Sequence, residues 1–129
     1  MRGVLGVSGG IPGTPGLHGS PASGVVFALD GMLGEVSLWF DGNGLLGQTM
    51  AHEIGHYLGL FHTTEMQQGM TDRLADTPEC PQSIMSDPYR MSECPDYGNL
   101  MFPTASMRDS VEVTPLQKGI LRGQPNVQP

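Results

Sequence analysis

The most informative stretch of the sequence is His52-Glu53-Ile54-Gly55-His56-Tyr57-Leu58-Gly59-Leu60-Phe61-His62. His52 and His56 are four residues apart, so on a helix they share one face and lie about 6 Å apart along the axis. Both imidazoles can then reach one metal ion, with Glu53 beside them as a base that does not ligate it. A catalytic zinc ion usually has three protein ligands, so a third ligand is required.

His62 can be that ligand only if the helix ends before it. In a continuous helix His62 would lie about 9 Å beyond His56 and well round the cylinder. Gly59 stands where the chain must turn, and glycine readily takes the left-handed conformation that ends helices. A merely solvated His–Glu–His face is the alternative, but the added glycine and third histidine favour a zinc site. We therefore expect His52, His56 and His62 to converge on one zinc ion.

The neighbouring segments predict a small α+β domain. Apolar residues recur at helical spacing and predict a helix over about 46–58, with one buried face formed by Met50, Ile54, Tyr57 and Leu58. Strands are expected at Val25–Leu29 and Val36–Phe40. A Thr114 N-cap, Pro115 and a capping-box Gln117 predict a C-terminal helix over about 115–122.

The remaining segments carry no sustained period. Residues 1–24 form a Gly/Pro-rich segment that we expect to be irregular, and residues 63–99 are expected to be a long loop region. The domain is therefore placed at 25–129. A small mixed sheet, the active-site helix and the C-terminal helix complete the expected fold.

Composition excludes some classes of function. The chain has 129 residues, which fits one domain, and a formal net charge of −7 with six scattered basic residues. A nucleic-acid surface needs clustered Lys and Arg, so we expect no nucleic acid partner. No apolar run approaches the roughly 18 residues of a membrane span, and no signal peptide is recognised at the start of the chain.

The two cysteines leave two interpretations open. Cys80 and Cys94 lie in a Pro- and Asp-rich region, each followed by a proline. A disulfide between them would close a loop whose stabilisation is about 3 kcal/mol in the chain-entropy model. Two free thiols in a reducing compartment are the alternative.

The eleven-residue pattern resembles the HExxHxxGxxH motif of the metzincin clan of zinc metallopeptidases. Asn99-Leu100-Met101 is similar to the clan's Met-turn, placed here at about 99–103. Three further segments resemble the pappalysin-like family within the clan: Leu60-Phe61-His62-Thr63, Asp72-Arg73-Leu74-Ala75-Asp76-Thr77-Pro78 and Thr114-Pro115-Leu116-Gln117. The resemblance covers about residues 48–121.

The resemblance implies a zincin catalytic domain that cleaves protein or peptide substrates. A zinc-activated water would attack the peptide bond, with Glu53 as general base and Met101 supporting the ligands. Related proteins bind calcium near the segment that carries Asp72, Asp76 and Thr77, whose oxygen ligands suit Ca²⁺; a capped, solvated turn is the alternative. The family also implies a secreted or extracellular protein.

Two departures from the family pattern support a second interpretation. The family usually has a tyrosine two residues after the Met-turn methionine, where this chain has Pro103, with Tyr97 as a candidate replacement. The part before His52 is also short, which suggests an N-terminally truncated domain. The alternative function is a non-catalytic zinc-binding or interaction module derived from a truncated metallopeptidase.

Overall fold

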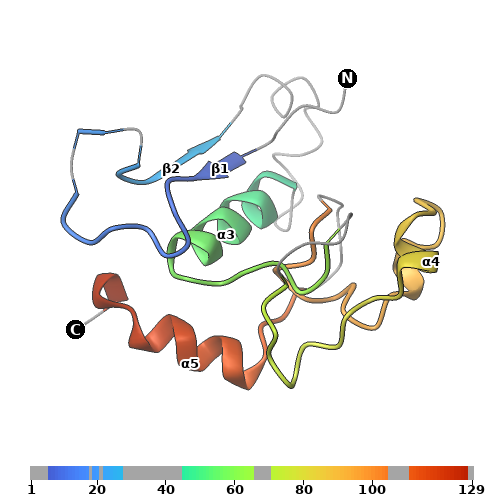
Figure 1. Ribbon diagram of the computed structural model, residues 1–129. Coiled ribbons are helices and arrows are strands. Elements are labelled where there is room, and N and C mark those ends of the chain that lie inside the picture. Colours follow the sequence, from blue (N-terminus) through green and yellow to red (C-terminus); the bar gives the residue numbers. More distant parts are fainter. Residues whose placement is uncertain are drawn as a thin grey trace.

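The computed structural model describes residues 6–17, 19–20, 22–27, 45–65, 71–104 and 111–127. These residues form a small α+β structure around one long helix (Figure 1). The regular elements, in chain order, are β1 (Gly6–Ser8), β2 (Val25–Phe27), α3 (Leu45–Tyr57), α4 (Gln82–Met85), the 3-10 turn η1 (Met91–Glu93), α5 (Pro115–Gly123) and the 3-10 turn η2 (Pro125–Val127). The sheet lies along one side of α3, and α5 lies on the other side (Figure 1).

Helix α3 lies where the sequence predicted a helix over about 46–58. The prediction of its buried face was wrong, because Met50 and Ile54 keep 39% and 43% of their surface exposed. The helix instead buries Thr49, Gly55 and His56. Apolar spacing indicated a helix correctly, but the packed face is the one that carries the histidines.

The sheet in the described part of the chain is an antiparallel pair, not the mixed sheet that was expected. Val7 pairs with Val26, and Gly6 pairs with Phe27. β2 confirms the first three residues of one predicted strand, whereas the strand expected at 36–40 lies outside the described residues.

Strand β1 corrects the prediction that residues 1–24 are irregular throughout. It has only three residues and begins with a glycine, so it is too short to show an alternating pattern. Its pairing with β2 and its packing on α3 are tertiary contacts, which no local pattern of apolar residues predicts. Further along, the N–H of Gly13 donates to the carbonyl of Tyr57 at 2.7 Å and attaches this segment to the end of α3.

A cluster of buried residues surrounds the disulfide between Cys80 and Cys94. It comprises Cys80, Met85, Met91, Cys94 and Phe102, with Ile84 and Tyr97 packed against it. The disulfide settles the choice that the sequence left open. The surrounding region is mostly irregular, as expected, apart from the single turns α4 and η1.

Helix α5 begins with the predicted capping box. The N–H of Gln117 donates to Thr114 Oγ1 at 3.2 Å, and Gln117 Oε1 accepts from the N–H of Thr114 at 2.9 Å. Asp76 adds a second cap, accepting from Thr114 Oγ1 and from the N–H of Leu116. These contacts anchor the start of α5 to the loop that carries Asp76. The helix ends at Gly123, one residue after its predicted end. None of the helices in the described ranges has the length and apolar character needed to cross a membrane.

Candidate metal centre

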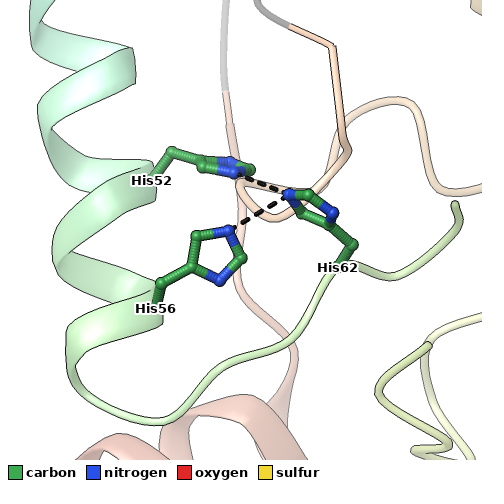
Figure 2. Close-up of side chains that lie close together, drawn as sticks. All are labelled: His52, His56 and His62. Carbon is green, nitrogen blue, oxygen red and sulfur yellow. Dashed lines mark hydrogen bonds between the residues drawn. The ribbon is translucent and has the colours of Figure 1, made fainter. Parts of the chain in front are cut away.

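Helix α3 and the loop after it bring three imidazoles together (Figure 2). His52 and His56 project from successive turns of α3, and His62 faces them from the loop. His62 Nε2 lies 3.1 Å from Nε2 of His52 and 3.1 Å from Nε2 of His56. These three residues form one of the two groups of potential metal ligands within the described part of the chain.

The turn that reverses the chain is built on Gly59. Its φ is +100°, in the left-handed region. The N–H of Leu60 donates to the carbonyl of Gly55 at 2.9 Å, and the N–H of Gly59 donates to that of His56 at 2.8 Å. This is the Schellman pattern, which satisfies carbonyls at a helix end and turns the backbone away from the axis. The turn confirms the predicted reversal and places His62 opposite the helix.

Each imidazole has its other ring nitrogen, Nδ1, beside an oxygen. Nδ1 of His52 lies 2.8 Å from the carbonyl of Leu100, and Nδ1 of His56 lies 2.7 Å from that of Leu60. Nδ1 of His62 lies 2.9 Å from Oε1 of Glu65. These oxygens only accept hydrogen bonds, so each neutral ring carries its proton on Nδ1 and leaves a lone pair on Nε2.

The donor set fits a zinc ion. Three Nε2 lone pairs that face one another at this separation repel unless a cation lies between them. Tetrahedral zinc with Zn–N bonds of about 2.0–2.1 Å would hold its nitrogens about 3.3 Å apart, close to the observed spacing. Burial lowers the pKa of His56, opposed in part by its hydrogen bond to Leu60, and so favours the neutral form that ligates metals.

Met101, in the segment that resembles a Met-turn, packs against α3 at Gly55. Its side chain is fully buried, and a methyl group at Gly55 would lie 2.6 Å from its sulfur. The N–H of Met101 donates to Oδ1 of Asn99 at 2.9 Å. Asn99 in turn exchanges two amide hydrogen bonds with Gln117 of α5, at 2.9 and 3.1 Å. Helix α5 is therefore linked through Asn99 to the turn that carries Met101.

Glu53 lies on the side of α3 that faces the sheet. A methyl group at Gly6 would lie 2.6 Å from its Cγ, so β1 approaches it closely because Gly6 has no side chain. Partial burial raises the pKa of the Glu53 carboxyl. The electrostatic interaction with His62 and a hydrogen bond from the backbone N–H of Ser8 lower the same pKa and offset part of that effect.

The residues considered for calcium lie near one another in the loop before the disulfide. Asp72 Oδ1 accepts from the hydroxyl of Thr77 at 2.6 Å and from the N–H of Leu74 at 3.1 Å. Both carboxylate oxygens of Asp76 are engaged in capping α5. These hydrogen bonds describe a capped turn, and calcium stays a prediction for this segment.

Tyr97, the candidate replacement for the tyrosine absent at Pro103, belongs to the disulfide cluster. Its ring packs against Phe102 with the ring centroids 5.4 Å apart.

Three features of the site were not predicted from the sequence. Glu65 contacts the third histidine, Gly55 makes room for Met101, and the carbonyl of Leu100 orients His52. Glu65 lies three residues after His62, outside any helix, so no periodic signal marks it. A backbone carbonyl has no sequence signal at all.

Comparison with known proteins supports the resemblance. A family model described as peptidase M43, pregnancy-associated plasma protein-A, matches residues 41–118, more than half of the chain. Extracellular metalloproteases of Arthroderma otae and Colletotrichum graminicola are 38% and 41% identical to it over 56 and 54 residues. Extracellular metalloprotease 1 of Coccidioides posadasii is 39% identical over 54 residues. The alignments cover about 40% of this chain but only 19–20% of these relatives. No solved structure gives a significant match.

Proposed function

The chain belongs to the M43, or pappalysin-like, family of metallopeptidases, and from this premise we propose that it is a zinc-dependent endopeptidase. The observation that carries the proposal is the convergence of three Nε2 atoms whose Nδ1 partners leave lone pairs facing one point. His52, His56 and His62 would hold the zinc ion. When bound there, zinc supplies Lewis acidity for the carbonyl and lowers the pKa of water toward 7.

Glu53 is the proposed general base. It follows His52 directly on α3, and its carboxylate is held beside the sheet by the backbone of Ser8. In this role Glu53 accepts a proton from the attacking water and passes it to the leaving amine nitrogen. The substrate is a protein or peptide, and an extended peptide can be aligned by pairing with the edge of β2.

We place this activity outside the cell. The disulfide between Cys80 and Cys94 suits an oxidising environment, and the relatives above are named extracellular metalloproteases. The chain spans about a fifth of the length of those relatives. Their metalloprotease activity is therefore proposed for this chain.

The test is Glu53→Ala in the 129-residue chain. We expect the variant to bind one equivalent of zinc as the parent does, because Glu53 is not a ligand. Its chelator-sensitive cleavage of casein or a fluorogenic peptide should fall by about 10²- to 10⁴-fold, the usual contribution of general acid–base catalysis. Metal analysis and a peptidase assay with and without chelator give both quantities.

Glu79→Ala is the matched control, because Glu79 is exposed and lies outside the cluster of histidines. Cleavage by Glu53→Ala at the parental rate would remove Glu53 from this role. A parent chain that binds zinc and cleaves nothing would instead favour the non-catalytic zinc-binding module.

A further inference from the structure

We propose that Glu65 is a positioning residue of the metal centre, which orients His62 and strengthens it as a ligand. This inference rests on the zinc site of the proposed function, and it concerns a residue that acts through His62 and not on the substrate. Its starting point is the 2.9 Å contact between Glu65 Oε1 and His62 Nδ1.

The three histidines differ in what holds them. Nδ1 of His52 and Nδ1 of His56 both face neutral backbone carbonyls, whereas Nδ1 of His62 faces the carboxylate of Glu65. A carboxylate that accepts the Nδ1 proton raises the basicity of the ligating nitrogen and fixes the plane of the ring. The carboxylate of Glu65 should therefore strengthen His62 in particular as a ligand.

His62 is also the histidine whose ring is least restrained by its own backbone. The backbone of α3 fixes His52 and His56 on successive turns, but His62 lies in a loop without regular structure. Its side chain is about a quarter exposed, so packing restrains it only in part. The contact with Glu65 supplies the restraint that a helix would otherwise give.

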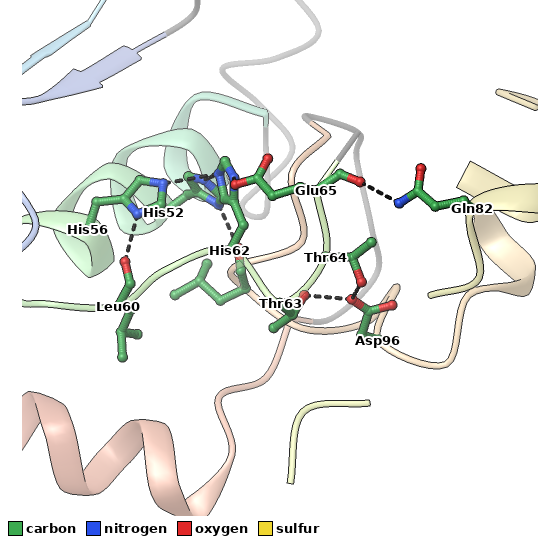
Figure 3. A network of polar contacts seen from close by, with 10 residues as sticks. His52, His56, Leu60, His62, Thr63, Thr64, Glu65, Gln82 and Asp96 are labelled. Carbon is green, nitrogen blue, oxygen red and sulfur yellow. Dashed lines mark hydrogen bonds and ion pairs between the residues drawn. The ribbon is translucent and has the colours of Figure 1, made fainter. Parts of the chain in front are cut away.

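The backbone that carries Glu65 is attached to neighbouring segments (Figure 3). The hydroxyls of Thr63 and Thr64 both donate to Oδ2 of Asp96 at 2.6 Å. Gln82 Nε2 donates to the backbone carbonyl of Glu65 at 3.0 Å. The segment after His62 is thus attached to the disulfide region, and the carboxylate of Glu65 reaches back to the imidazole from a fixed backbone.

The first experiment measures zinc affinity by competition with a chromophoric chelator. Glu65→Ala should bind zinc about 10- to 100-fold more weakly than the parent, the usual effect of removing such a partner. Glu65→Gln keeps an oxygen acceptor and loses the charge, so its loss should be smaller. With cobalt as the probe, the visible ligand-field bands of Glu65→Ala should shift, because they report the geometry of the ligands.

Glu93→Ala is the matched control, since Glu93 also contacts a residue three positions away, Arg90, but on the exposed surface. It should leave zinc affinity and the cobalt bands unchanged. Circular dichroism of the metal-free proteins shows whether each variant is folded, and Glu65→Gln provides the test if the alanine variant is not.

A double-mutant cycle with His62→Ala separates positioning from a general structural role. If Glu65 acts through His62, then Glu65→Ala should change zinc affinity by no more than about twofold when His62 is already absent. An equal loss in both backgrounds would overturn the proposal, as would parental zinc affinity in a folded Glu65→Ala. A parent chain that binds no zinc would overturn the zinc site itself, and the role of Glu65 with it.

Discussion

Gly59 is the single residue on which the third ligand depends. Its φ of +100° is one that residues with a Cβ rarely adopt, and a methyl group there would lie 2.9 Å from Nε2 of Gln124. Both features act on the same turn, because this turn ends α3 and directs the chain toward His62. A side chain at this position would oppose the backbone conformation and crowd α5.

We predict that Gly59→Ala lowers the free energy of unfolding by about 1–3 kcal/mol, the cost of a non-glycine residue in strained backbone. Zinc affinity should fall as well, because His62 would be displaced. Urea unfolding of the metal-free protein and a zinc titration measure the two effects. Gly98→Ala is the control, since nothing lies within 4 Å of a methyl group there. Equal stability of the two variants would contradict the role of the turn.

At the scale of elements, α3 packs directly on the turn that carries Met101. Gly55 lies on the buried face of the helix, with the sulfur of Met101 against it. The turn is tied to α5 by the two hydrogen bonds between Asn99 and Gln117. Helix α3, the turn at residues 99–101 and α5 are therefore linked in series, and Gly55 sets how closely α3 and the turn approach.

Two substitutions in α3 should act in opposite directions. Gly47→Ala should stabilise the protein by up to about 1 kcal/mol through helix propensity, because its methyl group would meet nothing within 4 Å. Gly55→Ala should gain the same stability from helix propensity. Overpacking against Met101 should, however, lower the free energy of unfolding by about 1–3 kcal/mol. Urea unfolding of both variants should therefore place Gly55→Ala below Gly47→Ala. Equal stability of the two variants would show that Met101 moves aside without cost.

At the scale of the molecule, the disulfide cluster is the main buried apolar group in the described part of the chain. It also supports the site, since Asp96 and Gln82 hold the segment after His62 and both lie close to the two cysteines in sequence. Stability and metal binding should therefore depend on the same crosslink.

We predict that Cys80→Ala combined with Cys94→Ala lowers the free energy of unfolding by about 3 kcal/mol or more, because the crosslink no longer restricts the unfolded chain and the cluster loses packing. Zinc affinity should fall in the same variant. Urea unfolding of the metal-free proteins and a chelator competition measure both. Unchanged zinc affinity in a destabilised variant would show that the disulfide supports the fold and not the site.

The sequence predicted which three histidines converge and left their surroundings open. His52, His56, Gly59 and His62 follow from spacing, because helix geometry and the length of a metal bond leave few ways to join three imidazoles. The capping box of α5 follows from local hydrogen bonding for the same reason. β1 and Glu65 do not, because strand pairing and the choice of a hydrogen-bond acceptor are decided by tertiary contacts.

The acceptors of the three Nδ1 protons have a consequence for work on shorter fragments. All the ligands fall within residues 52–62, yet the oxygens that orient them come from Leu60, Glu65 and Leu100. A synthetic peptide of that span would contain every donor atom and only one of those three oxygens. Such a peptide would bind metal with two of its three rings unrestrained, and its affinity would understate that of the intact chain.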